Sequence, residues 1–427
     1  MMKSVPKDVK RFQSLQIWDT LKPELPWYFA VSTNNMPAKY LISKRITTDL
    51  DIKHATEDEL WLEHDQLIQI FLQMWRSIKT AQVKLADLPK ANNTSLMDIN
   101  VELVKRMLTH CNFCRWNCKV DRAKATKYGA CKLESTSRVS TYFHHLGEEL
   151  PIRGTVGSGT IFFTSCNMRC SFCQNGDISQ DKDNGIPMTP QLLALMAWQL
   201  RMEGCHNINW VGGEPTIHLH NIVEAISLID SFQKPDRTNL RYIESANSDY
   251  FEKWSMNSEY AFYNGEFNAP QLWNSNFFMS LETLKILRTL IDVWLPDFKF
   301  GPGKCAINIS RTPWYWETIT NNLKVVHEWG DDIVIRHLIM PAHVECCTKP
   351  VLQWIEQNMP EVPVNIMDQY HPDSFCDPMS AKYDSRYQEI SRLPTNEEIL
   401  ESYRYAKELH LNFELLSYEK SVHGLSV

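Results

Sequence analysis

From residue 159 onward, short and continuously apolar runs alternate with amphipathic segments, and this alternation constrains the fold most strongly. The first two runs are residues 159–164 and 207–213, and later ones cover 292–300, 332–340 and 362–370. Continuous apolar strands that are separated by helices pair in parallel, with the helices packed on the outside. We therefore predict an α/β fold in which about six βα units form a partial or complete barrel, with a site at the C-terminal ends of its strands.

The segments between these runs carry start and stop signals for helices. One segment opens with Thr189 as N-cap and Pro190 in the first turn, and the last one opens with a capping box at Thr395–Glu398. A further strand is expected at either residues 240–246 or residues 269–273. The expected helices cover residues 189–204, 220–233, 280–291, 314–329, 349–358 and 395–410.

The first hundred residues stand apart, because none of the twelve cysteines precedes Cys111. Residues 58–80 have apolar side chains at helical spacing, which predicts an amphipathic helix. Such a helix either packs on the main body or docks a partner. The predicted domains are an N-terminal, partly helical extension (1–100), a four-cysteine module with a linker (101–150), and the barrel (151–427) with an insertion at 236–269.

Composition narrows the class of protein. A formal net charge of -7 argues against a broad surface for nucleic acid or for an anionic membrane, so neither partner is expected. No apolar run approaches the roughly 18 residues of a membrane span, and the N-terminal residues lack the apolar region of a signal peptide. We therefore expect a cytoplasmic protein, in which twelve cysteines indicate metal or redox chemistry rather than disulfides.

A group of three cysteines, the cysteine trio, directly follows the first apolar run and consists of Cys166, Cys170 and Cys173. A tetrahedral zinc site needs a fourth ligand nearby, and the next thiol, Cys205, comes more than thirty residues later. Three thiolates that leave one position open suit a [4Fe–4S] cluster in which one iron has no protein ligand. Phe172 adds an apolar ring beside such a cluster. A structural zinc or an incomplete site is the alternative.

This Cx3Cx2C pattern at a strand end, with an aromatic residue before the final cysteine, resembles the radical S-adenosylmethionine (radical SAM) superfamily. The resemblance implies that S-adenosylmethionine chelates the open iron and is cleaved by one electron to a 5′-deoxyadenosyl radical, which abstracts hydrogen. The second run ends in VGGEP, which resembles the turn that takes the ammonium group of the cofactor. Gly212 and Gly213 would let the backbone approach closely, and Glu214 would supply the carboxylate.

Longer stretches resemble the pyruvate formate-lyase activating enzyme-like branch of that superfamily, over roughly residues 108–417. They are GSGTIFFTSCNMRCSFCQNGDIS, NINWVGGEPTIHL, WNSNFFMS, WLPDFKFG, IRHLIMP and VNIMDQYHP. In this branch an arginine on a late strand and a histidine after the next strand contact the cofactor, which implies these roles for Arg336 and His371. Here DQYHP replaces the usual proline–tyrosine–histidine turn. This branch also has an aspartate–lysine pair on the fourth strand, which implies that Asp297 and Lys299 help to hold the cofactor and its cation. For these two residues, and for Arg336 and His371, the alternative is a buried ion pair.

A second group, the four-cysteine module, has the spacing Cx2Cx3Cx12C and consists of Cys111, Cys114, Cys118 and Cys131. Four thiolates need no outside ligand, so this second site suits either a structural zinc or an auxiliary iron–sulfur cluster. In the linker that follows, Glu148, Glu149 and His144 either face the substrate or lie in a surface hairpin. The other cysteines, among them the adjacent Cys346 and Cys347, are expected to be buried thiols.

The leading hypothesis is a radical SAM enzyme that takes an electron from a flavodoxin- or ferredoxin-type donor and abstracts hydrogen from a protein, a peptide or a small molecule. A glycyl-radical-enzyme activase is the alternative within the class, and the four-cysteine module argues against it because simple activases need only one cluster. A non-catalytic iron–sulfur electron-transfer protein is the alternative from another class. The insertion at 236–269 is aromatic and polar, and it either shapes substrate access or forms a surface loop.

Overall fold

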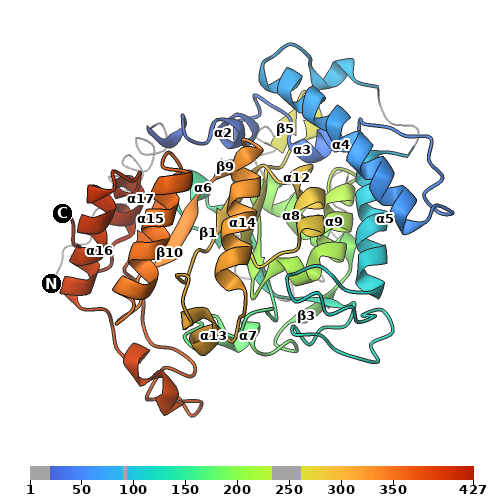
Figure 1. Cartoon of the computed structure of the whole chain (residues 1–427). Helices are drawn as coiled ribbons and strands as arrows, with labels where there is room; N and C mark the ends of the chain where they lie inside the picture. The colour runs from blue at the N-terminus through green and yellow to red at the C-terminus, as the bar shows by residue number, and fades with distance from the viewer. Residues whose placement is uncertain (1–19, 90–93, 233–260) are drawn as a thin grey trace.

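The computed structural model describes residues 20–89, 94–232 and 261–427, and it has the predicted α/β fold with a partial barrel at its centre (Figure 1). Its parallel strands are β2 (Ser158–Phe163), β4 (Ile208–Gly212), β7 (Gln271–Ser275), β8 (Val293–Pro296), β9 (Asp332–Ile333), β10 (Ile335–Leu338) and β11 (Val364–Met367). The order β2–β4–β7–β8–β9 is continued to β10 and β11 by a parallel bridge between Asp297 and Arg336.

A short interruption divides the fifth position of the barrel into β9 and β10. Only Val334 lies between them, and its amide donates a hydrogen bond to Trp294 O at 2.9 Å. The two pieces therefore continue one strand, and the described chain has six parallel strand positions, as the alternation predicts. The third position is β7, so the expectation of a strand at 269–273 is confirmed, whereas residues 240–246 lie outside the described residues.

Helices follow the strands and cover the outside of the barrel (Figure 1). All six predicted helices are present: α8 (Pro190–Met202), α9 (Leu219–Leu228), α12 (Leu281–Arg288), α14 (Tyr315–Glu328), α15 (Lys349–Asn358) and α16 (Asn396–Glu408). Thr189 caps α8 by accepting from the Leu192 amide, and Thr395 forms the predicted capping box with Glu398. Shorter helices are α6 (Leu150–Arg153), α7 (Gly176–Ser179), η2 (Pro215–His218), α13 (Cys305–Ser310), η4 (Val344–Thr348), η5 (Ser385–Ile390) and α17 (Glu414–Lys420).

Two antiparallel strands that the sequence did not predict extend the sheet beyond β2. They are β1 (Ser137–His145), which pairs with β2, and β3 (Ile186–Met188), which pairs with β1. The linker of the four-cysteine module is therefore partly a sheet strand, which covers the edge of β2.

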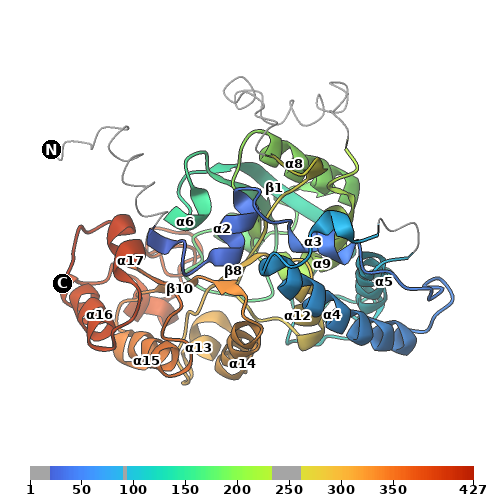
Figure 2. The ribbon, with the colours of Figure 1, turned by 90° about the horizontal axis from the view of Figure 1, so that it is seen from above.

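The N-terminal helices are α2 (Pro26–Ser32), α3 (Lys39–Ser43), α4 (Glu57–Lys79) and α5 (Leu96–Thr109), with the turn η1 (Leu85–Asp87) between the last two. The predicted helix at 58–80 is α4, and buried side chains such as Phe71 belong to the same hydrophobic core as the barrel. Asp292 accepts from Trp27 Nε1 at 2.8 Å, and Asp332 accepts from the Tyr28 amide at 2.7 Å. Figure 2 shows α2, α3 and α4 packed along the barrel. The N-terminal helices therefore share one hydrophobic core with the barrel, and the domain boundaries given above stay predictions.

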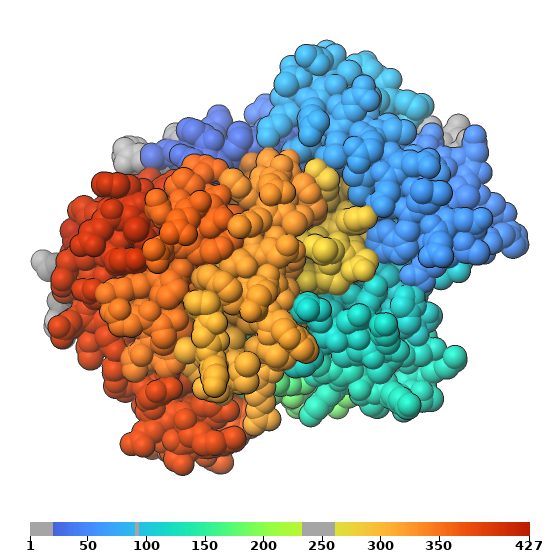
Figure 3. Space-filling model, viewed as in Figure 1, coloured from blue at the N-terminus to red at the C-terminus, as the bar shows by residue number. Residues whose placement is uncertain are grey.

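The four-cysteine module lies in residues 110–136, which form a loop-rich lobe at the lower right of Figure 3. An isolated bridge from Cys114 to Met279 ties this lobe to the barrel. Most of the predicted insertion lies outside the described residues. Its last part forms the strand pair β5 (Phe262–Tyr263) and β6 (Glu266–Phe267).

The outer side of β11 is covered by the C-terminal segment. The Val364 amide donates to Asn412 O at 2.9 Å, and the Ile366 amide donates to Ser417 Oγ in α17 at 2.8 Å. Among the described residues, no helix is both long and apolar enough to cross a membrane.

Candidate active site

The cysteine trio lies in the loop that begins where β2 ends. Ser165 turns the chain in a left-handed conformation, with φ 65°, which non-glycine residues adopt only when the surroundings hold them. Cys166, Cys170 and Cys173 all line one cavity, and Phe172 lines it between the last two. The structure therefore brings together the four residues that the sequence assigns to the cluster.

Polar groups of the chain surround the sulfurs of the trio. The Met168 amide donates to Cys166 Sγ at 3.3 Å, and Ser179 Oγ lies 3.1 Å from Cys173 Sγ. Hydrogen bonds to cysteine sulfurs are one of the means by which a protein tunes the potential of an iron–sulfur cluster. Burial raises the pKa of all three thiols, that of Cys170 to about 12, so deprotonation has to be driven by metal coordination.

The glycines after β4 are needed for close packing of the backbone. A Cβ atom on Gly212 would lie 2.2 Å from Phe163 N, and one on Gly213 would lie 1.7 Å from Ser165 O. No side chain fits at such distances, so both positions require glycine. Both glycines line the cavity as predicted, but the close approach that they allow is to the end of β2 and to the loop of the cysteine trio.

Glu214 is buried and lines the same cavity. Its Oε1 accepts from the amide and the hydroxyl of Thr216, at 3.1 and 2.5 Å, and from Ser275 Oγ at 2.6 Å. Its Oε2 accepts from the Asn276 amide at 2.9 Å, and from no other donor in the part of the chain that the structure describes. Burial raises the pKa of Glu214. Since each carboxylate oxygen can accept about two hydrogen bonds, Oε2 keeps capacity for one more donor.

Asp297, Lys299 and Arg336 form a charged wall of the cavity. Lys299 Nζ lies 2.6 Å from Asp297 Oδ2, and Arg336 Nε donates to Asp297 Oδ1 at 2.8 Å. The other arms of the guanidinium reach Asn274 Oδ1 at 2.5 Å and Glu148 Oε1 at 3.3 Å. Burial by itself would raise the pKa of Asp297, but the Arg336 and Lys299 cations hold it below its ordinary value.

Glu148 and Glu149 are buried just after β1 rather than in a surface hairpin. Glu148 lines the cavity, accepts from Asn209 Nδ2 at 2.7 Å and lies 3.3 Å from His145 Nδ1. Burial disfavours its charge, yet the contact with His145 and the charge of Arg336 hold the pKa of Glu148 well below its usual range. Burial raises the pKa of Glu149. The pair therefore favours an ionised Glu148 beside a less acidic Glu149.

Two predicted histidines lie away from the cavity. His144 is buried on the other side of β1, where its Nε2 lies 2.7 Å from Glu203 Oε2, because successive side chains of a strand point in opposite directions. His144 therefore lies neither toward the cavity nor in a surface hairpin, and its neighbour His145 lines the cavity instead.

His371 is 55% exposed and pairs with Asp373 at 3.2 Å. It follows β11 by four residues and does not line the cavity, whereas Met367 and Gln369 from the same segment do. The structure therefore places His371 outside the lining of the cavity, and its contact with the cofactor stays a prediction.

The cavity has a volume of about 350 Å³ and reaches from the strand ends into the barrel. Pockets for small ligands begin near this size. Sequence reasoning did not assign several of its polar lining residues, which are His145, Asn274, Ser275, Asn276 and Gln369. Three of them lie in the stretch WNSNFFMS. Its position at the end of a predicted parallel strand could have indicated that these side chains line the site.

The four-cysteine module supports the loop of the cysteine trio from behind. Three hydrogen bonds join them: Cys131 O accepts from Ser165 Oγ (2.7 Å), Ala130 O from Arg169 Nη2 (2.8 Å) and Asn167 O from Trp116 Nε1 (2.8 Å). The backbone of the module therefore fixes the path of the trio.

The sulfurs of the four-cysteine module are spread more widely than a zinc site requires. Zn–S bonds of about 2.3 Å keep all sulfurs of a tetrahedral site within about 4.6 Å of one another. Within the described ranges, a group of three metal-binding side chains whose ligand atoms lie within 4.8 Å of one another is found elsewhere, at Cys305, His343 and Cys346. All residues of the module are described, and no three of its sulfurs lie within 4.8 Å of one another.

Comparison with known proteins agrees with the geometry of the cavity. A family model described as the radical SAM superfamily matches residues 160–251, which contain the cysteine trio and the glycine turn. The chain belongs to this superfamily. It is 32% identical over 391 residues to "Uncharacterized protein MJ0674" of Methanocaldococcus jannaschii, covering 90% of this chain and 97% of that protein, and it belongs to the same family.

Solved structures show more distant likenesses. SuiB of Streptococcus suis, bound to precursor peptide SuiA, is 13% identical with a TM-score of 0.37, over 58% of this chain and 46% of that one. The structure titled anSMEcpe with bound AdoMet is 12% identical with a TM-score of 0.35, over 61% and 65%. This chain thus spans less than two thirds of either structure, and both likenesses are too distant to inform the site.

Proposed function

We propose that this protein holds a [4Fe–4S] cluster on Cys166, Cys170 and Cys173 and binds S-adenosylmethionine in the adjoining cavity. When bound, these groups would supply hydrogen abstraction, because one-electron cleavage of S-adenosylmethionine gives methionine and a 5′-deoxyadenosyl radical. The proposed substrate is a protein, a peptide or a small molecule. Membership of the radical SAM superfamily supports this class of reaction.

One observation carries the proposal: side chains from three separate strand ends line a single cavity. The cysteine trio follows β2, Glu214 follows β4, and Asp297 and Lys299 follow β8. Sites of parallel α/β barrels form at this end of the strands. A protein that only transfers electrons has no use for a ligand cavity beside its cluster, so the geometry favours an enzyme.

The residues of the wall take different roles in this proposal. Glu214 Oε2, which has capacity for one further donor, would accept a hydrogen bond from the ammonium group of the cofactor. Lys299 would face the carboxylate side of the cofactor while Asp297 holds it in place. Arg336, whose guanidinium already reaches three acceptors of the chain, would position Asp297 and Glu148.

A reduced protein of the flavodoxin or ferredoxin type would supply the electron. Gln174 and Asn175, next to Cys173, are exposed, so a donor can approach the cluster loop from that side. We also propose that the four-cysteine module holds an iron–sulfur cluster rather than zinc, on the basis of its wide sulfur spacing. Iron analysis distinguishes the two, since two cubane clusters contain about eight irons and one contains about four.

The test is anaerobic reconstitution with iron and sulfide, followed by addition of dithionite and S-adenosylmethionine. We expect 5′-deoxyadenosine in the wild-type protein, and in Cys205→Ala as a control, because Cys205 is buried outside the cavity. Absence of 5′-deoxyadenosine from protein that carries the full cluster would refute the proposed chemistry. A glycyl radical, seen by electron paramagnetic resonance in an added partner enzyme, would assign the chain to the activase alternative.

A further inference from the structure

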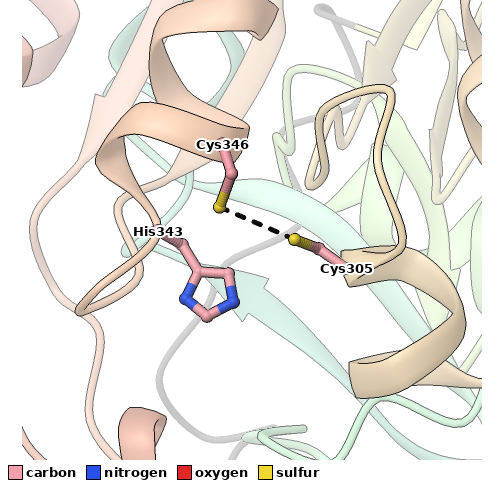
Figure 4. Close-up of side chains that lie close together, drawn as sticks. All are labelled: Cys305, His343 and Cys346. Atoms are coloured by element: carbon pink, nitrogen blue, oxygen red, sulfur yellow. Dashed lines mark hydrogen bonds between the residues drawn. The ribbon is translucent and has the colours of Figure 1, made fainter.

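A compact group of sulfur and imidazole side chains lies outside the cavity. Cys305 begins α13, whereas His343 and Cys346 lie at the start of η4, so distant parts of the chain meet here. Figure 4 shows the three side chains pointing toward one another. Cys305 Sγ lies 3.6 Å from Cys346 Sγ, and one nitrogen of His343 lies within 4.8 Å of both sulfurs.

These distances distinguish between the uses that such a group could have. A disulfide needs sulfurs about 2.05 Å apart. Sulfur ligands of one tetrahedral zinc ion, each about 2.3 Å from the metal, lie about 3.8 Å apart. The 3.6 Å separation of Cys305 and Cys346 is close to the second value, and Cys347 Sγ lies 3.9 Å from Cys346 Sγ. The sulfurs are therefore spaced for one shared metal ion.

His343 is held in the way that is typical of a metal ligand. Its Nδ1 lies 3.0 Å from Pro341 O and can donate to it, which fixes the ring and leaves Nε2 with its lone pair. The Glu389 carboxylate is 3.7 Å from the imidazole but 61% exposed, so it is free to turn away.

We propose that Cys305, His343 and Cys346 form a mononuclear zinc site with three protein ligands, in which the fourth position of the tetrahedron would be taken by a solvent molecule. Their geometry places the site between two loops of the barrel. Cys305 ends the loop that follows β8 and carries Asp297 and Lys299, and His343 follows β10, which carries Arg336.

Zinc at this place would tie together the two loops that build the charged wall of the cavity. The loops already approach closely: a Cβ atom on Gly301 would lie 2.1 Å from Cys346 O. The ion would therefore act as a structural link beside the cavity. This proposal rests on the donor geometry alone and does not depend on the radical chemistry.

The first test is the zinc content of anaerobically purified protein, measured by mass spectrometry of the metals. We expect roughly one zinc per chain more in the wild type than in Cys305→Ser/Cys346→Ser, since a site with two ligands removed no longer holds the ion. Glu345→Gln is the matched control, because Glu345 lies in the same turn, is 78% exposed and should leave the zinc content unchanged. Equal zinc in the wild type and the double variant would overturn the proposal.

A second test needs no variant, in case the double variant does not fold. Cys346 is exposed, so iodoacetamide should alkylate it readily unless a metal ion protects it. We expect little alkylation of Cys346 in zinc-loaded wild-type protein and strong alkylation after a chelator, measured by peptide mass spectrometry. Equal alkylation before and after the chelator contradicts the site, and so does a Cys305–Cys346 disulfide in the native protein. Neither test uses cleavage of S-adenosylmethionine. Failure of the zinc proposal can therefore be distinguished from failure of the proposed function.

Discussion

Among the single residues, Arg336 connects the largest number of charged groups in the cavity wall. Its side chain is 15% exposed and lies among Asp297, Asn274 and Glu148, and the carboxylates raise its pKa although partial burial opposes its charge. A buried cation with such partners stabilises the fold mainly by preventing the carboxylates from being left buried and unpaired.

Arg336→Ala should therefore lower the free energy of unfolding by about 3–5 kcal/mol. The matched control is Arg386→Ala, whose guanidinium is 67% exposed and pairs with Asp384, and there we expect a change within about 0.5 kcal/mol. Denaturant unfolding of the two variants under anaerobic conditions gives both values. Equal stabilities would mean that the charged wall does not depend on Arg336.

A second prediction at this scale concerns the cysteine trio. Replacing Cys166, Cys170 and Cys173 together by Ala should remove about four irons and all formation of 5′-deoxyadenosine, because the cluster loses all three of its protein ligands. Iron analysis and chromatography of the reaction products measure both effects. Retained cleavage of S-adenosylmethionine in this variant would be incompatible with our assignment of the cluster.

Residues with a local pattern could be predicted from the sequence, and residues that meet only in the fold could not. The trio is recognisable because its spacing is local, and Glu214 because it follows a glycine pair at a strand end. Cys305 and Cys346 were interpreted as buried thiols, since nothing in their separate surroundings indicates that β8 and β10 bring them together. The direction of the His371 side chain could not be predicted, because an irregular loop has no periodicity from which it follows.

Among the elements, the lobe of the four-cysteine module determines the position of the neighbouring loop. It contributes the backbone oxygens of Ala130 and Cys131 to hydrogen bonds with that loop, which follows β2. The module therefore links its own folding to the shape of the cavity.

Cys114→Ala should lower stability and yield, because metal binding to a four-thiolate site contributes folding energy directly. Iron at the cysteine trio should persist in the fraction that folds. Thermal unfolding and metal analysis, with Cys205→Ala as the control for the loss of a buried thiol, check the two expectations. A stable Cys114→Ala protein with unchanged metal content would show that these thiols form no site.

The helices could be predicted well at the scale of elements, and one strand could not. Caps such as Thr189 and Thr395 define where helices begin, because their hydroxyls accept from backbone amides that would otherwise be unpaired. The strand β1 has the sequence SRVSTYFHH, which contains many polar residues. Such a strand resembles a linker until its partner β2 is known.

At the scale of the whole molecule, two buried carboxylates join the N-terminal layer to the barrel. Asp292 and Asp332 accept from Trp27 and Tyr28 of α2, near the N-terminal ends of the strands. Burial raises the pKa of Asp292 to about 6 and that of Asp332 to about 7.

The stability of the protein should therefore depend on pH through Asp332. Its folded-state pKa lies above its ordinary value of 3.8, so its contribution is fully present below about pH 4 and is lost as the pH rises to about 7. Relative to Asp332→Asn, the wild type should lose up to about 4 kcal/mol of unfolding free energy across this window. Urea unfolding from pH 4 to pH 8 measures the loss, with the exposed Asp49→Asn as control. Parallel curves for the wild type and Asp332→Asn would contradict this prediction.

The hydrogen bonds from Val364 and Ile366 to the C-terminal segment have a consequence for self-association. Strands with free amides at the border of a sheet recruit strands of other molecules, and this is a common route to aggregation. Asn412 and Ser417 occupy these amides on β11, so the segment keeps neighbouring copies of the chain from pairing there. A chain without residues 411–427 should scatter more light than the full chain at the same concentration, because its last barrel strand would be open to a second molecule.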